Sequence, residues 1–188
     1  NNAWSKKWMF KSILSAHIAY DHPDMGTRFF SSPALKGKAS LIPHGVDASV
    51  FKPNSVIKER TFVIGCIGNI GANKNQLTIL KALADCGLSI QCHLYGNTDP
   101  EYFRILREFI SGNNLETKVV FRGFVDNASL SEVLNGFDIL VLASFNEGLP
   151  VILLEAMACG VYCIASDSGG GSRYILENCS NGALFDPD

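Results

Sequence analysis

Short apolar runs alternate with stretches of helical spacing over most of the chain from residue 61 onward. Each apolar run is bounded by glycine or by polar residues, which is typical of buried strands. The runs predict strands over 61–68, 88–96, 117–124, 138–143 and 161–166. Between and after them, apolar residues recur every three or four positions. These stretches predict helices over 74–87, 99–112, 127–136, 150–160 and 172–177.

Strand and helix therefore alternate five times with short loops. This order predicts a Rossmann-like, doubly wound α/β fold, in which helices cover both faces of a parallel sheet. In such sheets ligands bind beyond the carboxyl ends of the strands, where helix N-termini converge. We therefore expect a site among the turns that follow the strands, at Gly68, Gly96, Gly123 and the loops 144–149 and 166–171.

The first part of the chain has no comparable order. A helix is expected over 4–16, a turn-rich stretch follows, and residues 41–54 have a proline near each end and the pattern of a linker. No internal repeat is evident. The sequence stops soon after the last predicted helix, so we expect the chain to be part of a longer protein.

Charge is unevenly distributed along this globular composition, which is 47% hydrophobic and 18% charged. Residues 1–60 hold nine Lys/Arg and four Asp/Glu, a balance of +5, whereas residues 61–188 hold seven and fourteen, a balance of −7. The basic part is either an ordinary solvated face or a peripheral contact with an anionic membrane surface. An anion bound by the acidic part would have to be held by local groups.

Cysteine usage and hydropathy point to an intracellular protein. The six cysteines form no CxxC pair and mostly lie in apolar runs, so we expect buried, reduced thiols and not zinc ligands or disulfides. No apolar run reaches the roughly 18 residues that cross a membrane. The N-terminal segment lacks an apolar stretch followed by a cleavage site, and we expect a cytoplasmic location.

The stretch GCIGNIGANKNQ (65–76) has the composition of a phosphate-binding turn but matches neither common motif. Cys66 interrupts the GxGxxG pattern, and the P-loop spacing is absent. Asn73 is a candidate N-cap, with Gln76 completing a capping box and Lys74 in the first helical turn. A lysine at this positive helix end is either simply exposed or binds an anion. Another glycine-rich turn, SDSGGG (166–171), is a weaker candidate for an anion nest.

The stretch NEGLPVILLEAMACG (146–160) places two carboxylates around an apolar run. Pro150 should occupy the first position of a helix whose first amides lack intrahelical partners and suit a phosphate or a hydroxyl. Glu155 falls in the second turn, where a buried carboxylate needs a partner such as a ribose diol. Glu147 precedes the helix. The alternative is that these glutamates only cap the helix or form salt bridges.

Two segments resemble a known family. IPHGVDASVF (42–51) looks like the hinge motif of retaining glycosyltransferases with the GT-B fold, although that motif usually has Asn where His44 stands. The segment 119–170, which begins with VVFRGFVDN and ends with IASDSGG, resembles the donor-binding half of glycosyltransferase family 4. The E-x7-E signature of that family falls on Glu147 and Glu155. The resemblance covers about residues 41–186.

This resemblance implies a site that holds a nucleotide-diphospho-sugar, with UDP or GDP as the nucleotide. Glu155 would hold the ribose, Glu147 the donor sugar near its anomeric carbon, and Lys74 the diphosphate leaving group, so that Glu147 and Lys74 are the catalytic candidates. The remaining donor-binding candidates are Gly68, Asn69, Phe124, Val125, Gly148, Leu149, Pro150 and Val151. Such a site needs no metal and no cofactor, because fixed dipoles and a lysine can stabilise the leaving group.

The family also implies a domain plan and an acceptor. Residues 1–43 would be the remnant of an acceptor-binding domain, 44–57 the hinge, and 58–188 a donor-binding domain cut short at its C-terminus. The acceptor would be a saccharide or a lipid-linked saccharide in polysaccharide biosynthesis, handled in the cytoplasm or at the inner face of the membrane, and no nucleic acid is expected. With most of the acceptor domain absent, we expect donor binding but little transfer by this chain alone.

Two departures from the family leave other functions open. Asn69 stands where these enzymes commonly have a second diphosphate-binding arginine, and Arg173 stands near the place of a frequent glutamate. The chain could therefore be a catalytically idle nucleotide-binding module. A nucleotide-sugar epimerase is a further alternative, although no acid/base set is visible. A nicotinamide dehydrogenase is disfavoured by Cys66.

Overall fold

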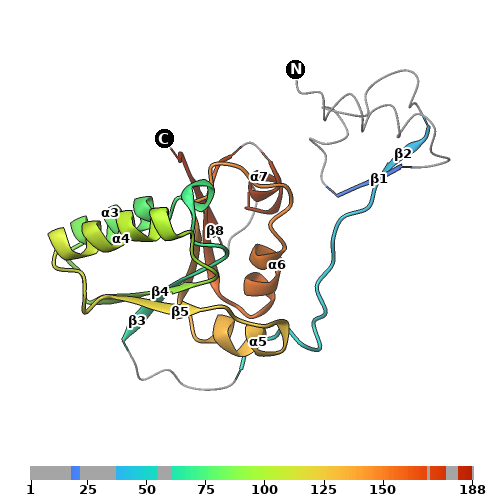
Figure 1. The fold of residues 1–188 in the computed structure, drawn as a ribbon. Helices are drawn as coiled ribbons and strands as arrows, with labels where there is room; N and C mark the ends of the chain where they lie inside the picture. Colours follow the sequence, from blue (N-terminus) through green and yellow to red (C-terminus); the bar gives the residue numbers. More distant parts are fainter. Residues whose placement is uncertain (1–17, 22–36, 55–60, 169, 177–181, 188) are drawn as a thin grey trace, which may run out of the picture. The chain divides into compact units, whose positions relative to one another are not determined.

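The computed structural model describes residues 18–21, 37–54, 61–168, 170–176 and 182–187 (Figure 1). The chain divides into two compact units, residues 1–45 and 46–188. The helix expected over 4–16 lies outside the described residues. The assignment of residues 1–43 to an acceptor domain and of 44–57 to a hinge stays a prediction.

The described part of the first unit is a pair of short parallel strands, β1 (Ile18–Tyr20) and β2 (Ala39–Leu41). The amide of Ile42 donates to the carbonyl of Tyr20 (2.8 Å) and extends the pairing by one bond. His44 Nε2 lies 3.9 Å from the Asp21 carboxylate in the same unit. Neither strand was predicted, because three residues are too few for a periodicity to show.

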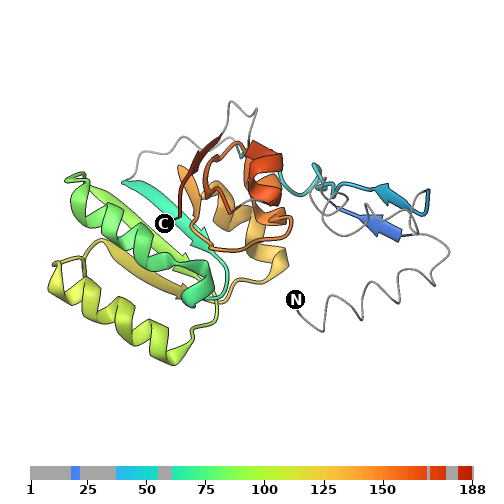
Figure 2. The same ribbon diagram turned by 90° about the horizontal axis from the view of Figure 1, so that it is seen from above.

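The second unit is built on a six-stranded parallel sheet with the order β5-β4-β3-β6-β7-β8 (Figures 1 and 2). Its strands are β3 (Phe62–Ile67), β4 (Ile90–Tyr95), β5 (Val119–Gly123), β6 (Ile139–Leu142), β7 (Tyr162–Ser166) and β8 (Gly182–Phe185). The order reverses between β3 and β6, which is the topological switch point of a doubly wound fold. The predicted fold class and its first five strands are confirmed, whereas β8 was not predicted.

Helices cover both faces of this sheet through two separate apolar clusters. They are α3 (Gln76–Asp85), α4 (Pro100–Gly112), α5 (Asn127–Asn135), α6 (Val151–Ala158) and α7 (Gly171–Leu176). Buried residues of α3 and α4 pack on the face that carries Cys92 and Leu94. Those of α5, α6 and α7 pack on the face that carries Val63 and Leu140. The five predicted helices are therefore present.

Two predicted helix starts were wrong. Pro150 is not the first helical residue but the extended residue before α6, with φ −76° and ψ 91°. Lys74 ends a separate 3₁₀ turn, η2 (Ala72–Lys74), and α3 begins only at Gln76, after Asn75 adopts a left-handed φ of 50°. Asn73 therefore caps no helix. By contrast, Pro100 does open α4, and Asp99 Oδ1 accepts from the amide of Tyr102 (2.8 Å) as its cap.

The segment expected to be a plain linker is bonded to the second unit at its C-terminal end. Asn135, 7% exposed on α5, donates from Nδ2 to the carbonyl of Lys52 (3.0 Å). Its Oδ1 accepts from the amide of Asn54 (2.8 Å). These bonds hold residues 52–54 against α5.

The described cysteines form no disulfide. Cys66, Cys92, Cys159 and Cys163 are buried as expected, and Cys86 is exposed. Burial raises the pKa of Cys66 to about 12, which keeps its thiol protonated. In the described part of the chain no helix has the length and apolar character of a membrane span, and no cluster of three His, Cys, Asp or Glu side chains is placed to hold a metal ion.

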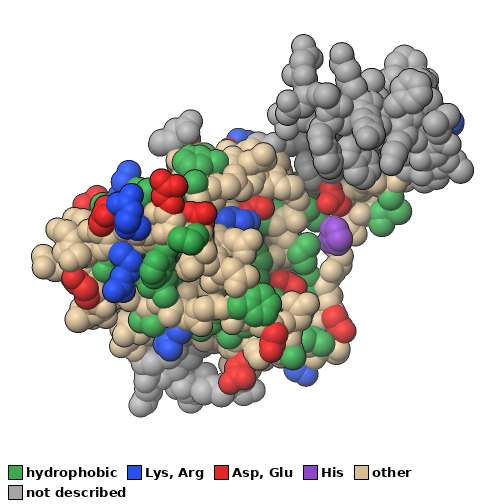
Figure 3. Space-filling model, in the orientation of Figure 1, with side chains coloured by type: hydrophobic (Ala, Val, Ile, Leu, Met, Phe, Trp, Pro, Cys, Tyr) green, Lys and Arg blue, Asp and Glu red, His purple; other side chains and the backbone are tan. Residues whose placement is uncertain are grey.

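Charged side chains on the described surface are mixed in sign. Over α3 and α4, Lys/Arg and Asp/Glu groups alternate on the face that Figure 3 shows. Arg104 and Glu108 of α4, for example, form an exposed ion pair of 2.6 Å. This face of the second unit therefore gives no single-sign field that would attract a charged partner.

Candidate functional site

Several candidate residues lie where β3 and β6 end side by side, at the switch point of the sheet. The amide of Phe145, just after β6, donates to the carbonyl of Asn73 in the loop after β3 (2.9 Å). Asn73 Nδ2 in turn donates to the carbonyl of Asn146 (3.2 Å). The residue predicted to cap a helix thus joins two loops, and it brings Lys74 and Glu147 together.

The loop after β3 rests closely on the loop after β4. The amide of Gly68 donates to the carbonyl of Tyr95 (3.0 Å), and that of Ile70 donates to the carbonyl of Asn97 (2.8 Å). Gly96 has φ +140°, and a Cβ placed on it would lie 2.1 Å from the carbonyl oxygen of Gly68. Only glycine allows the two loops to approach this closely.

Gln76 braces the same loop from within. Its side chain, 1% exposed, donates from Nε2 to the carbonyl of Asn69 (3.1 Å) and accepts from the amide of Gly71 (3.3 Å). The predicted capping box is therefore absent, and the glutamine instead fixes the turn that carries Asn69. Sequence reasoning found the residue but assigned it the wrong role.

Lys74 and Glu147 form an ion pair at the centre of the site. Lys74 Nζ lies 2.5 Å from Glu147 Oε1, and the side chains are 27% and 14% exposed. A Cβ on Gly68 would lie 3.5 Å from Lys74 Cε, an ordinary contact, so the φ of +146° and not crowding by the lysine favours glycine here. Each residue was predicted to face a different part of a ligand. In the structure each satisfies the other, so a bound anion would have to compete with Glu147 for the ammonium.

Glu155 lies on the second turn of α6 and has the opposite character. Its side chain is half-buried, less than the sequence suggested, and among the described residues it has neither a hydrogen bond nor an ion pair. Desolvation raises the pKa of the Glu155 carboxyl above its ordinary value. Hydrogen bonds from hydroxyl donors would stabilise such a carboxylate.

The turn 147–150 presents backbone groups in front of α6. A Cβ on Gly148 would meet no atom within 4 Å, so space is open beside this residue. In the described structure the amides of Gly148, Leu149 and Val151 make no backbone hydrogen bond outside the helix. These orphan donors are the groups that suit a phosphate or a sugar hydroxyl.

The loop after β7 supports this turn instead of forming an open nest. The amide of Gly171 donates to the carbonyl of Gly148 (2.8 Å). A Cβ on Gly170 would lie 2.7 Å from the carbonyl oxygen of Glu147, and one on Gly171 would lie 2.3 Å from that of Gly148. The sequence indicated flexible glycines for an anion, but the structure uses them for close packing.

Arg173 is bound to the same loop. Its Nε donates to Asp167 Oδ1 (3.0 Å), and its Nη2 donates to Asp167 Oδ2. This forked pair joins α7 to the residue just after β7. It also leaves Asp167 less acceptor capacity for a ligand.

Phe124 and Val125 follow β5, two strands away from β3. Phe124 is 70% exposed, while Val125 packs against the apolar cluster beneath α5 and α6. The pair lies at the same carboxyl edge of the sheet as Lys74 and Glu147, separated from β3 by β4, and its part in donor binding stays a prediction. Phe145, missed by the sequence reasoning, is 48% exposed in the loop next to Glu147. An aromatic residue directly after a predicted strand was the signal that could have found it.

Comparisons with known proteins agree with this architecture. The family model "Glycosyl transferases group 1" matches residues 47–188. EpsF of Bacillus subtilis (strain 168), named as a glycosyltransferase, is 31% identical over 153 residues, which are 74% of this chain and 39% of EpsF. The α-1,3-galactosyltransferase of Escherichia coli that acts with UDP-Gal on α-D-GlcNAc-diphosphoundecaprenol is 27% identical over 166 residues, 79% of this chain and 41% of that protein.

A solved structure shares the fold. Anabaena HepE in complex with UDP and glucose matches with a TM-score of 0.85 and 22% identity, covering 97% of this chain and 53% of that one. The sheet is thus of the kind found in GT-B glycosyltransferases. The chain belongs to the group 1 glycosyltransferase family. It spans only 39–41% of the length of the two curated relatives named above.

Proposed function

We propose that this chain is the donor-binding part of a retaining glycosyltransferase of the family 4 type. It binds a nucleotide-diphospho-sugar, with UDP or GDP as the nucleotide, and the complete enzyme transfers the sugar to a saccharide or a lipid-linked saccharide. The observation that carries the proposal is the juxtaposition of the Lys74–Glu147 pair with the open amides in front of α6. Family membership supports it.

In this proposal the diphosphate displaces Glu147 from Lys74. The ammonium then neutralises the oxygen that becomes the leaving group, and the amides of Gly148, Leu149 and Val151 add fixed dipoles without a metal ion. The released Glu147 carboxylate accepts hydrogen bonds from the donor sugar. Because Glu147 already holds the lysine at this position, the ammonium needs little reorganisation when the ligand binds.

Glu155 would hold the ribose. Two vicinal hydroxyls can donate to one carboxylate, and the half-buried position makes each such bond stronger than it would be in water. The relatives support the choice of ligand, since HepE was solved with UDP and the Escherichia coli enzyme takes UDP-Gal and a lipid-linked acceptor. The reaction then belongs in the cytoplasm, at the inner membrane face when the acceptor is lipid-linked.

The internal Lys74–Glu147 pair also favours a second candidate, a nucleotide-binding module without transfer activity. With Asn69 in place of a second cation, the pair leaves no uncompensated positive charge in the loop 68–75. Such a module would bind the nucleotide through Glu155 but gain nothing from the sugar. The two candidates differ in whether the sugar part of the ligand contributes to affinity.

Thermal unfolding of the chain with UDP, GDP, ADP and their glucose conjugates tests the proposal. A ligand at 100 times its Kd stabilises by about 2.7 kcal/mol, which is about 5–10 °C in Tm for a chain of this size. We expect the largest shift with one nucleotide sugar, and a loss of that shift in Glu155→Ala but not in the matched exposed variant Glu108→Ala. Equal shifts with and without the sugar would favour the idle module. No shift with any nucleotide would refute both.

A further inference from the structure

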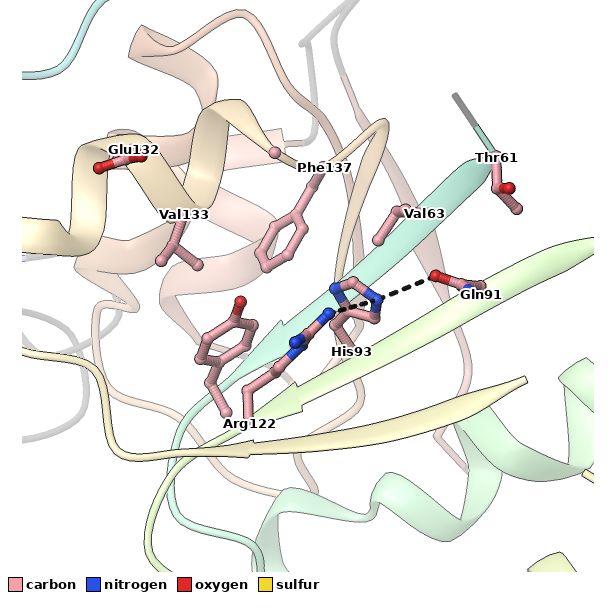
Figure 4. Close-up of a pocket in the computed structure, with 10 residues that line it drawn as sticks. Thr61, Val63, Gln91, His93, Arg122, Glu132, Val133 and Phe137 are labelled. Carbon is pink, nitrogen blue, oxygen red and sulfur yellow. Dashed lines mark hydrogen bonds between the residues drawn. The ribbon is translucent and has the colours of Figure 1, made fainter. Parts of the chain in front are cut away.

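A hollow lies on the α5 side of the sheet, and no residue of the loops 68–75 and 144–151 lines it (Figure 4). It has a volume of about 460 Å³, within the range of about 300–1,000 Å³ that small-molecule sites occupy. Strands β3, β4 and β5 form its floor, and α5 with the turn after it forms one wall. Its lining is Thr61, Val63, Gln91, His93, Tyr95, Arg122, Glu132, Val133, Gly136 and Phe137.

The alternation of the strands explains why this hollow is polar. On β4, Cys92 and Leu94 are fully buried under α3 and α4, so Gln91 and His93 must point to the other face. On β5, Arg122 is exposed on the same face as these two residues. Over β4 and β5, the α5 side of the sheet therefore carries a polar strip, which we define as Gln91, His93 and Arg122, while the opposite side of the same two strands carries an apolar core.

Phe137 closes the apolar end of the hollow. A Cβ on Gly65 would lie 2.1 Å from its ring, so the ring occupies the space that a side chain on β3 would fill. It lies 5.9 Å from the ring of Tyr95, at an angle of 58°. Val63 and Val133 continue this apolar surface. Phe137 and Val63 are only 2% and 6% exposed, so the accessible apolar surface beside the polar groups comes mainly from the partly buried Tyr95 and Val133.

The polar groups form a short chain of planar side chains. His93 Nε2 lies 3.2 Å from Gln91 Oε1 and 3.5 Å from Arg122 Nη2. The second contact is long, so the exposed guanidinium can turn toward a ligand without losing a strong bond. Figure 4 shows Glu132 on α5, across the hollow from Arg122. Both residues belong to the lining, so one cationic and one anionic residue border the hollow.

This balance decides the class of ligand. A phosphate would gain from Arg122 but would be repelled by Glu132, whereas hydroxyl groups both donate and accept and can bond to both. Planar side chains that bind neighbouring hydroxyls in pairs, next to apolar surface for C–H groups, suit a sugar ring. We propose that this hollow is a saccharide-binding site for a neutral mono- or disaccharide, separate from the nucleotide-binding loops. Sugar binding here does not depend on donor binding at Glu155.

The test is a titration of the full 188-residue chain with glucose, galactose, N-acetylglucosamine and maltose, followed by backbone NMR. We expect saturable shifts confined to residues 91–95, 120–123 and 131–137 with at least one sugar. Arg122→Ala and Glu132→Gln should each weaken binding by about tenfold or more, because each removes hydrogen bonds to a charged group. The matched controls Arg104→Ala and Glu108→Gln, an exposed pair on α4, should leave the affinity unchanged.

Further variants and ligands distinguish a saccharide site from an anion-binding site. Arg122→Lys keeps the charge but not the planar fork, and we expect it to bind as weakly as Arg122→Ala. Full rescue by lysine would overturn the proposed geometry. Shifts that appear only at residues 144–151, saturation by inorganic phosphate or UMP in place of sugars, or no saturation with any of the four sugars would each overturn the proposal.

Discussion

The two glutamates of the E-x7-E motif lie in contrasting surroundings. Glu147 is 14% exposed, pairs with Lys74, and belongs to a turn that Asn73 and Gly171 hold in place. Glu155 is half-buried on α6 and has no partner among the described residues. The first carboxylate is satisfied by a partner within the protein, whereas the second carries an uncompensated desolvation cost. Under the proposed function, the first group would exchange its partner on ligand binding and the second would gain one.

The largest effect on stability is expected from a glycine that supports the loop carrying Lys74, the partner of Glu147. In Gly96→Ala, the new Cβ would lie 2.1 Å from the carbonyl oxygen of Gly68 at φ +140°, so the loops after β3 and β4 would have to separate. We expect the free energy of unfolding to fall by about 3 kcal/mol or more, measured by urea titration. In the control Gly112→Ala no atom lies within 4 Å, and a small change is expected. Equal losses in both variants would contradict a steric role for Gly96.

The next effect concerns the Lys74–Glu147 pair itself. A double-mutant cycle with Lys74→Met and Glu147→Gln should give a coupling energy of about 1–2 kcal/mol, because both groups are largely withdrawn from water. The same cycle on Arg104 and Glu108, which are 62% and 64% exposed, provides the control. That surface pair should give about 0.3–0.5 kcal/mol. A coupling at Lys74–Glu147 no larger than this would mean that water still screens the site.

Neutralising Glu155 should stabilise the chain, whereas neutralising Glu147 should destabilise it. Its pKa is raised in the folded chain, so the folded state binds more protons than the unfolded state between the ordinary value of 4.5 and the raised one. Stability should therefore decrease as pH rises through this window and stay lower above it. Glu155→Gln should stabilise the ligand-free chain at pH 7 by less than about 1 kcal/mol, since the group is partly solvated.

Urea titrations of Glu155→Gln at pH 7 and at pH 4 measure this difference. The gain over the parent chain should shrink at pH 4, where the parent carboxyl is itself protonated. Glu108→Gln on the exposed face of α4 serves as the control and should show no such gain. A loss of stability in Glu155→Gln at pH 7 would indicate a structural bond to the carboxylate.

The smallest effect is expected at Asn73. Asn73→Ala removes the Nδ2 bond to the carbonyl of Asn146 but keeps the backbone bond from Phe145. Because the lost bond is exposed, we expect the unfolding free energy to fall by no more than about 0.5 kcal/mol. Nucleotide affinity should fall more clearly, since the turn before Glu147 loses one of its two ties. Unchanged affinity, measured by calorimetry, would show that the backbone bond is sufficient.

The sequence predicted the elements of the second unit well because their signals are local. The apolar run at 61–68 and the Asp99–Pro100 start of α4 need no tertiary information. The missed strand β8 (Gly182–Phe185) begins with glycine, so its apolar run is only the three residues 183–185. So short a run does not stand out from a loop.

The candidate residues could be selected from the sequence one by one but not as an arrangement. The E-x7-E spacing singled out Glu147 and the glycine-rich turn singled out Lys74, yet their pairing depends on β6 lying beside β3, which no local pattern encodes. The role of Gln76 was wrong for the same reason, because its partners are set by the path of the loop. The polar strip at Gln91 and His93 was readable from the alternation in IQCHLY but was overlooked.

The position of β6 beside β3 also determines when the site can form during folding. Lys74 and Glu147 are 73 residues apart, and the bond from the amide of Val63 to Asp138 Oδ2 (2.7 Å) spans 75 residues. The strands β3, β4 and β5 can pair through sequence-local crossovers before β6 arrives. Closing so long a loop is slow, so the ion pair should be among the late contacts to appear. A nascent chain that has not yet delivered β6 would have a half-sheet and a lysine, but no site.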